Sequence, residues 1–431
     1  MSKSASSDVA SASFSTASSS KGAVSRARRS SSPAYSSLTD VQTSARAIRY
    51  IFQARFQDAN HLLTSNRNSS SSASLSATHS FVAFTQALVS YESDQISDAL
   101  ALWKQTEKLC SASKNDSAED KLEQKVLLAD AKICSTFLQL LQSADFGGLL
   151  KGSWALRQAW KLYQSTYEDL LKQIEQSFRH GELSKTEVAI LRHNLPHPFQ
   201  GDGPAGGYTA SERDLVLSHS RPLFMRLFQI MGLVCYGFGC FHLLLSLLPG
   251  HLLKWLKFLG FEGDMHVGMR ALTYCMNSPD SKSLLARMTL IWFHTVIQTY
   301  YAIDEDQMQE GIDSAGVLLE GLDNPLRASP LVQFFDCRLM RYKGNFDGAI
   351  QSYTSSLESS TYVKEINVLL HHEIGILRFH LQEWNSSIDH LLKCFHEGRW
   401  GKILYAYLIG LCYGVMKDVR RRRNSSRKCP A

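Results

Sequence analysis

Beyond residue 40, apolar residues recur at spacings of three and four along almost the whole chain. Such spacing places them on one face of an α-helix, whereas a half-buried strand requires alternation, and no sustained alternation occurs. Polar stretches at 64–80, 111–118 and 193–214 interrupt the pattern. The sequence therefore predicts an all-α protein, with its first helix at 41–55 and its last at 400–417.

Two segments in the last third of the chain share one pattern. Arg341–Ile350 reads RYKGNFDGAI and Glu383–Ile388 reads EWNSSI, with Ser387 lying 38 residues after Ala349. Gly375 and Gly410, which stand in similar apolar settings, are 35 residues apart. These distances bracket the period of about 34 residues that is typical of a tetratricopeptide repeat. In that repeat, small residues let the two helices of a hairpin pack closely.

The same pattern occurs near the start of the chain. Phe56–Ala59 and Gln95–Leu100 share it, with Ala59 and Ala99 lying 40 residues apart. A bundle of unrelated helical hairpins is the alternative interpretation. Because several units are in phase, we favour a repeat array. The predicted architecture is a superhelix of tetratricopeptide-like helical hairpins.

Leu227–Leu248 is a run of 22 residues without Asp, Glu, Lys or Arg, long enough to cross a bilayer as a helix. Basic residues flank it on both sides, so its loops indicate no orientation. The favoured interpretation is a central helix that neighbouring hairpins bury, since His242 at its centre suits a protein core better than lipid. The alternative is an organelle- or lipid-droplet-associated membrane protein anchored through residues 227–248.

The formal net charge of +6 comes from the two ends of the chain. Residues 1–39 carry a net charge of +4 and residues 420–431 carry +6, which leaves −4 for residues 40–419. A nucleic-acid-binding protein would carry positive charge on its folded surface, so we expect no nucleic-acid partner. The first 37 residues contain sixteen serines, a composition typical of disorder.

Nine cysteines are scattered along the chain and form no Cys-x-x-Cys pair. In a chain of this length, such cysteines indicate reduced thiols rather than a disulfide framework. The N-terminal residues also lack the apolar segment of a secretory signal. We therefore expect a cytoplasmic protein, with the nucleus and the cytosolic face of an organelle membrane as alternatives.

The motifs that resemble enzyme sites lack their required context. Gly201–Gly206 matches the dinucleotide fingerprint, but that fingerprint follows a strand, and the preceding Leu195–Gln200 contains two prolines. His371-His372-Glu373 lacks the second histidine, four residues on, of a helical zinc site. The sequence therefore predicts no catalytic residue, no metal site and no cofactor.

Three sequence blocks resemble one family. The main block is Tyr236–Pro249 (YGFGCFHLLLSLLP), continued by Phe258–Asp264 (FLGFEGD) and Gly268; the others are Phe84–Leu100 and Gly152–Tyr163. Together they resemble the tetratricopeptide repeat protein 39 family, which includes the fungal inclusion body clearance proteins, over about residues 45–416. The resemblance implies a non-enzymatic helical-repeat scaffold or adaptor. The roles that it suggests are lipid homeostasis, clearance of aggregated protein and cilium-related assembly.

Family members continue with further helices, whereas the third C-terminal unit here ends after its first helix. A repeat array that ends within a unit is expected to expose an apolar face.

The sequence divides into six parts. They are a disordered Ser-rich tail (1–40), an N-terminal helical-repeat region (41–193), a Gly/Pro-rich loop (194–214), central apolar helices with the family signature (215–279), C-terminal tetratricopeptide-like repeats with the last one incomplete (280–417), and a basic disordered tail (418–431).

The expected partners are proteins that place a peptide or helix in the groove of the array. Membrane association at an organelle surface stays open. The sequence gives no oligomeric state.

Some repeats of this type clamp a carboxylate with Lys and Asn on successive first helices. Of the corresponding positions here, only Arg338 would serve, so the groove is expected to accept an apolar or amphipathic helix. Its predicted lining is Phe334, Arg338, Arg341, His372, Ile376 and Phe379.

Overall fold

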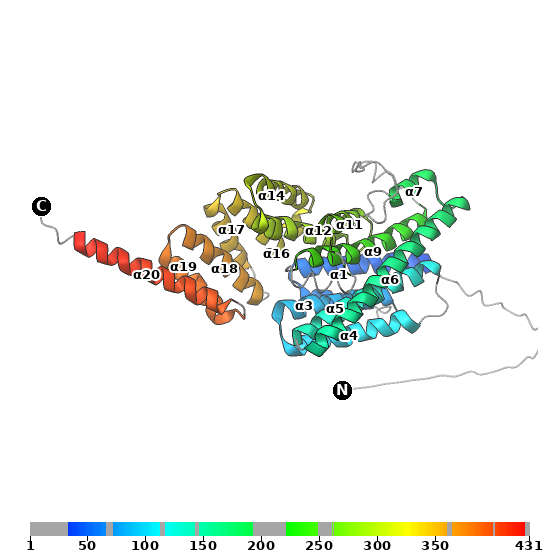
Figure 1. Cartoon of the computed structure of the whole chain (residues 1–431), viewed down its shortest axis with the longest axis horizontal. Coiled ribbons are helices and arrows are strands. Elements are labelled where there is room, and N and C mark those ends of the chain that lie inside the picture. The colour runs from blue at the N-terminus through cyan, green and yellow to red at the C-terminus, as the bar shows by residue number, and fades with distance from the viewer. Residues whose placement is uncertain are drawn as a thin grey trace, which may run out of the picture.

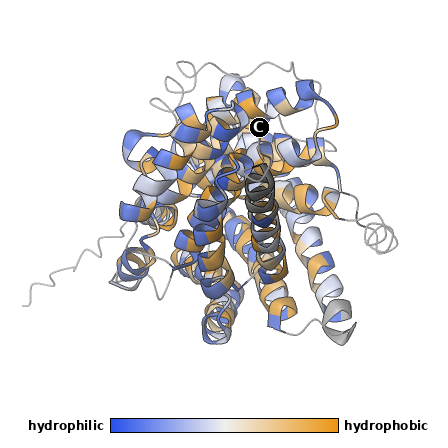
Figure 2. Ribbon diagram, turned by 90° about the vertical axis from the view of Figure 1, so that its left-hand side faces the viewer, coloured by the Kyte–Doolittle hydropathy of each residue, from blue (hydrophilic) through white to orange (hydrophobic). Residues whose placement is uncertain are grey.

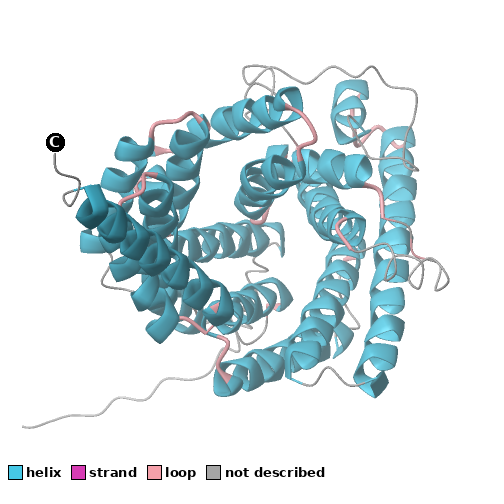
Figure 3. Ribbon diagram, turned by 60° about the vertical axis from the view of Figure 1, so that its left-hand side comes forward, coloured by secondary structure: helices cyan, strands magenta, loops and turns pink. Residues whose placement is uncertain are grey.

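The computed structural model describes residues 33–65, 72–112, 117–142, 146–192, 221–248, 261, 263–359, 364–399 and 401–426. Every regular element within these ranges is helical (Figure 3), which confirms the predicted all-α class. Figure 2 shows that many helices carry both apolar and polar residues, as helices that bury one side require. The predicted Gly/Pro-rich loop at 194–214 lies outside the described residues.

The helices follow one another as hairpins from a broad N-terminal cluster to α20 at the far end (Figure 1). The N-terminal part consists of α1 (Pro33–Phe52), α2 (Phe56–Ser65), α3 (Ala73–Ser90), α4 (Ser93–Ala112), α5 (Ala118–Gln142), α6 (Phe146–Arg179) and α7 (Lys185–Arg192). The central part consists of α9 (Pro222–Ser246), α11 (Met265–Asn277), α12 (Ser283–Trp292), the π-helix η1 (Phe293–Gln298), α13 (Thr299–Tyr301), α14 (Glu305–Glu320) and α15 (Asn324–Arg327). The C-terminal part consists of α16 (Pro330–Tyr342), α17 (Phe346–Ser359), α18 (Lys364–His380), α19 (Trp384–Glu397) and α20 (Lys402–Ser426).

One turn recurs at three hairpins. Ala54, Gly344 and Gln382 all have positive φ, at 58°, 76° and 61°. In each turn the next residue donates its amide to the carbonyl five residues earlier, at 2.8, 2.9 and 2.9 Å. This is the Schellman geometry that ends a helix and reverses the chain.

A fully buried small residue follows five positions after each of these turns. The three residues are Ala59, Ala349 and Ser387, and each is 0% exposed. The hydroxyl of Ser387 donates to the carbonyl of Gly375 at 2.9 Å, so the second helix of this hairpin lies directly against the first. One structural unit thus recurs near both ends of the chain, which confirms the predicted tetratricopeptide-like superhelix.

Two boundaries in serine-rich sequence differ from the prediction. α1 begins at Pro33, within the predicted tail of residues 1–40, and α3 begins at Ala73, within the polar stretch at 64–80. The polar composition of these stretches predicted breaks between helices, but Ser72 caps α3 by accepting the amide of Leu75 at 3.3 Å. Ser80 is buried and bonds to the hydroxyl of Thr106 on α4 at 2.9 Å. Serines therefore take part in helix packing here.

The predicted disordered tail at 418–431 also needs correction, because α20 continues to Ser426 and includes Arg420–Arg423. Arginine is a good helix former, so a run of arginines extends an existing helix. Nearer the centre of the chain, α12 passes into the π-helix η1 before α13.

The apolar run at 227–248 forms most of α9, which lies inside the fold. Among the described residues, α9 is the one helix with the length and composition to cross a membrane, and 83% of its apolar window is buried. It packs against α5, α6 and α11. At the crossing with α11, a Cβ on Gly268 would lie 2.9 Å from the carbonyl oxygen of Gly239, so the two backbones touch. The favoured interpretation, a helix buried by its neighbours, describes this arrangement.

The blocks that resemble the family meet around α9. The indole of Trp160 stacks on Phe238 and Phe241, with ring centroids 4.9 Å apart in both pairs. It also meets His242 edge-on at 5.1 Å. The Nδ1 atom of His242 accepts the amide of Asp264 at 3.1 Å, just before α11. The signature residues therefore build the core rather than an exposed site.

A buried ion pair lies close to α9. The carboxylate of Asp130 on α5 pairs with Lys282 and accepts the hydroxyl of Tyr163 at 2.7 Å. Only 11% of the Asp130 side chain and 12% of the Lys282 side chain are exposed. Burial opposes the charge of Lys282, but Asp130 and Asp280 outweigh it and raise the pKa of Lys282. Because both charges are satisfied, α5, α6 and the segment before α12 are fixed to each other.

The repeated turn predicts opposite effects for two substitutions. Gln382→Gly relieves the left-handed conformation of a residue with a Cβ, so the free energy of unfolding should rise by about 0.5–1 kcal/mol. Gly344→Ala introduces that strain and should lower the same free energy by about 1 kcal/mol. Urea unfolding followed by circular dichroism measures both. Changes of the same sign would contradict the shared turn geometry.

Acid is expected to weaken the core through His242. Burial lowers the pKa of His242 from 6.5 to about 4, so the folded protein binds fewer protons than the unfolded chain in this range. The stability that neutral His242 contributes is fully present above pH 6.5. As the pH drops to 4, the free energy of unfolding therefore falls by about 3 kcal/mol. His242→Phe retains the buried ring, so its unfolding free energy should fall less steeply with acid. Equal slopes in urea titrations would contradict this.

Candidate partner-binding surface

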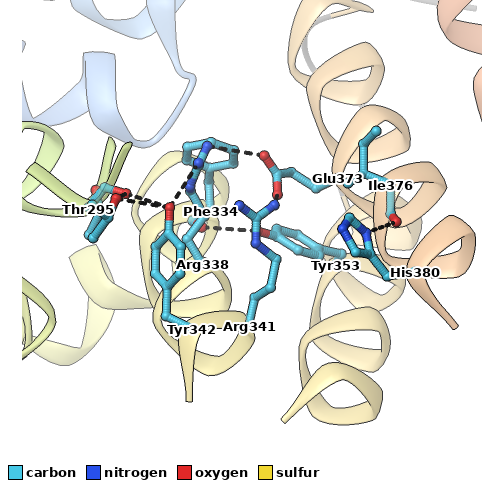
Figure 4. A network of polar contacts seen from close by, with 10 residues as sticks. Thr295, Phe334, Arg338, Arg341, Tyr342, Tyr353, Glu373, Ile376 and His380 are labelled. Carbon is cyan, nitrogen blue, oxygen red and sulfur yellow. Dashed lines mark hydrogen bonds and ion pairs between the residues drawn. The ribbon is translucent and has the colours of Figure 1, made fainter. Parts of the chain in front are cut away.

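Three of the predicted residues share one face of α16, because they are spaced by four and three residues. They are Phe334, Arg338 and Arg341. Glu373 faces them from α18 (Figure 4). Its two carboxylate oxygens accept from Arg338 at 3.2 Å and from Arg341 at 2.9 Å. The predicted residues of the first repeat helix are therefore already joined to the next repeat.

The carboxylate of Glu373 is the most deeply buried charge of this network. Its side chain is 2% exposed, while those of Arg338 and Arg341 are 16% and 22% exposed. Burial opposes the charge of Arg338, but Glu373 outweighs it and raises the pKa of the guanidinium. The Arg338 guanidinium also lies 5.5 Å from the ring centroid of Phe334. Two cations and one anion leave a single positive charge, and a second, incoming carboxylate would have to compete with Glu373.

Tyr342 extends the network to the preceding unit. Its hydroxyl donates to the carbonyl of Thr295 at 3.0 Å and accepts from Thr299 at 3.0 Å and from Arg338 at 3.2 Å. The carbonyl of Thr295 belongs to the π-helix η1. Three consecutive units, at η1, α16 and α18, are thus fixed in one geometry.

The other predicted residues lie along α18 and do not join this network. The ring of His372 meets Tyr405 of α20 edge-on, with centroids 5.7 Å apart. Phe379 packs edge-on against Trp384 of α19 at 5.5 Å. Ile376 is half-buried, and its carbonyl bonds to the ring of His380 at 2.7 Å. Binding of a partner by the six predicted residues stays a prediction.

Sequence reasoning missed Glu373, because it considered this residue only as part of a zinc motif. The available signal was its distance of 35 residues from Arg338, about one repeat period, which places the two on matching faces of successive first helices. Among the residues that the structure describes, no group of three or more His, Cys, Asp or Glu side chains is arranged to hold a metal ion.

α20 carries an exposed apolar face. It packs on α19 through Tyr405, Ile409 and Cys412, all 9% exposed or less. Beside this contact, Leu404 is 48% exposed and Tyr407 is 63% exposed. The same face continues through other apolar side chains. They are Leu411 at 39% and Val415 at 40%. Ile403, at 88%, is also exposed but lies about 100° around the helix from Leu404.

The fold and its repeat geometry agree with the comparison to known proteins. The sequence profile of the family described as Iml2/Tetratricopeptide repeat protein 39 matches residues 45–429. The chain belongs to this family. Tetratricopeptide repeat protein ttc-39B of Caenorhabditis elegans is 27% identical over 192 residues, which cover 44% of this chain and 32% of that relative. The matched segment thus spans about a third of the relative's own length. The Iml2/tetratricopeptide repeat protein 39 family indicates a protein-interaction scaffold.

The network at Glu373 predicts a large loss of stability on substitution. Glu373→Ala leaves two half-buried guanidinium groups without their carboxylate, so the unfolding free energy should fall by about 3 kcal/mol or more. Glu397→Ala, an exposed change on α19, should alter it by less than about 0.5 kcal/mol. Chemical denaturation of both variants measures the difference. A Glu373→Ala protein as stable as the control would show that the network adds nothing to the fold.

Proposed function

We propose that the chain is a non-catalytic scaffold that binds an amphipathic helix of a protein partner along α20. One observation carries the proposal: an apolar stripe stays exposed on α20 after this helix has packed on α19. Leu404, Tyr407 and Leu411 are between 39% and 63% exposed. A contiguous exposed apolar surface is typical of an interaction site.

The spacing of this stripe suits a helical partner. Leu404, Tyr407, Leu411 and Val415 follow one another at steps of three and four residues, so they share one face of α20. Side chains at these steps form the ridges that pack into the grooves of another helix. A partner helix would thus continue the stacking by which α19 already packs on α20.

Charge indicates which kind of helix fits. α20 begins at Lys402, and its sequence includes Lys417 and Arg420–Arg423 against the single acid Asp418. Complementary charge speeds association and selects among partners. We therefore propose a partner helix with one apolar face and acidic residues beside it.

The α20 face supports partner binding better than α16 does. On α16, Arg338 and Arg341 are engaged with Glu373, and Phe334 is 8% exposed. A partner docked there would have to displace contacts that hold the repeats together. On α20, docking buries apolar surface that is already exposed, at a gain of about 25 cal/mol per Å².

We also propose that this binding takes place in the cytoplasm. The eight cysteines within the described residues are free thiols, as suits a reducing compartment. Burial raises the pKa of Cys240 to about 12, so its thiol stays protonated and unreactive. Lipid homeostasis, aggregate clearance and cilium-related assembly are the roles that the family suggests. The identity of the partner helix would distinguish them.

A membrane anchor at 227–248 has less support. The apolar window of α9 is 83% buried in protein, and the pair of Lys282 and Asp130 lies beneath this helix. Insertion of α9 into lipid would expose that pair and remove the core of the N-terminal part. We therefore propose the scaffold rather than the anchor.

Peptide binding tests the scaffold directly. The probe is a fluorescent helical peptide with leucines at steps of three and four and glutamates beside them, titrated by anisotropy against the full chain. We expect saturable binding that weakens at least tenfold in the double variant Leu404→Asp/Leu411→Asp, since each lost leucine contact removes about 1–2 kcal/mol. The same peptide with lysines in place of glutamates should bind more weakly than the acidic one.

Tyr413→Asp is the matched control. Tyr413 is 54% exposed on α20 but lies on another side of the helix from the stripe, so its substitution should leave the affinity within about twofold. Equal loss in the control and the double variant would point to damage of α20 itself. Unchanged binding in the double variant would refute the proposed surface.

A further inference from the structure

The end of α13 and the turn that leads into α14 expose three large apolar side chains. Tyr300 is 80% exposed, Tyr301 is 65% exposed and Ile303 is 90% exposed. The two tyrosine rings meet edge-on, with centroids 5.1 Å apart. We call these three side chains the Tyr300 patch. Apolar side chains that gather on the surface in this way are typical of an interaction site.

Hydrogen bonds hold the backbone of this turn in place. Asp304 caps α14 by accepting the amide of Gln307 at 2.8 Å, and the side chain of Gln307 accepts the amide of Ile303 at 3.3 Å. From η1, the side chain of Gln298 donates to the carbonyl of Gln307 at 3.2 Å. The turn is therefore ordered before a partner arrives, which lowers the entropy cost of binding.

The exposure of Ile303 is unusual for its position. In many helices an apolar residue just before the cap packs against the fourth residue of the helix, which in α14 is Met308. Here almost none of the Ile303 side chain is buried. It is therefore available to a partner.

The helix that follows the patch is acidic. Between Arg287 and Arg327 the sequence contains seven Asp or Glu and neither Lys nor Arg. Asp306, Glu310 and Asp313 follow one another at steps of four and three, so they share one face of α14, and all three are exposed. The ion pairs between described residues engage none of these three carboxylates.

We propose that the Tyr300 patch and the acidic face of α14 together bind a basic segment of a protein partner, in which arginines or lysines stand beside apolar residues. The apolar side chains of the segment cover Ile303, and its cations pair with Asp306 and Glu310. Arginine suits the tyrosines as well, because the face of an aromatic ring attracts a guanidinium. Complementary charge of this kind speeds association and selects among partners.

This surface is separate from the apolar stripe of α20, and neither proposal depends on the other. The α20 stripe selects an acidic helix, whereas the surface on α14 selects a basic segment. The negative charge of α14 also repels nucleic acid and anionic lipid, which leaves a protein segment as the ligand.

A basic peptide tests the proposal. The probe is a short fluorescent peptide in which arginines alternate with leucines, titrated by anisotropy against the full chain. We expect saturable binding of one peptide per chain, which weakens severalfold as salt is raised because salt screens exposed charges. The same peptide with glutamines in place of arginines should bind about tenfold more weakly.

One pair of variants tests the patch. Tyr300→Ser removes an exposed ring and should weaken peptide binding about fivefold. Tyr407→Ser makes the same change at a tyrosine of α20 that is 63% exposed, and it should leave the affinity within about twofold. Because both side chains are exposed, both variants should keep the circular dichroism spectrum and the urea midpoint of the parent chain.

A second pair tests the charges. Asp306→Asn/Glu310→Gln should weaken binding about tenfold and flatten its dependence on salt. Asp94→Asn/Asp98→Asn is the matched control, since it also neutralises two exposed carboxylates four residues apart, one of them in the first turn of its helix. That helix, α4, packs against α3 and α5 in the N-terminal part (Figure 1). Its substitution should leave the affinity within about twofold.

Three results would overturn the proposal. If Tyr407→Ser weakens binding as much as Tyr300→Ser, the peptide lies on α20. If the two charge variants weaken binding equally, the peptide responds only to net charge. If sedimentation shows a dimer that Tyr300→Ser dissociates, the surface belongs to a contact with a second copy of the chain.

Discussion

The packing of α9 depends on the buried pair of Lys282 and Asp130. α9 is apolar on nearly all sides and must be covered by protein from every direction. Asp130, with its bonds to Lys282 and Tyr163, fixes α5, α6 and the segment before α12 in the positions that provide this cover. Removing one partner of such a pair leaves an uncompensated buried charge, which costs about 3–5 kcal/mol.

From this core the helical hairpins extend toward α20 (Figure 1). A positive-φ turn reverses the chain at Gly344 and at Gln382, and Glu373 joins α18 to α16. The charged groups of α16 that face α18 are therefore engaged in the architecture. The apolar stripe of α20 differs, because its side chains stay exposed after α20 has packed on α19.

The sequence was sufficient for features that depend on local pattern. Helical periodicity, the turn around Gly344 and the long apolar helix all follow from residues close together in the chain. Contacts between distant residues did not follow, because a charge pattern does not say which charges meet. Asp130 and Lys282 are 152 residues apart, and Arg49 and Asp323 are 274 apart. The helix starts within serine-rich sequence were missed because serine caps and packs helices when its hydroxyl finds a backbone or side-chain partner.

Hydrogen exchange of the purified chain, in buffer without detergent, tests the central claim that α9 is the buried core helix of a helical-repeat scaffold. The account predicts that amides of α9 exchange most slowly, with the free energy of global unfolding, while those of α20 exchange much faster. Exchange of α9 as rapid as that of α20, or slow exchange of α9 that appears only after addition of lipid vesicles, would contradict it.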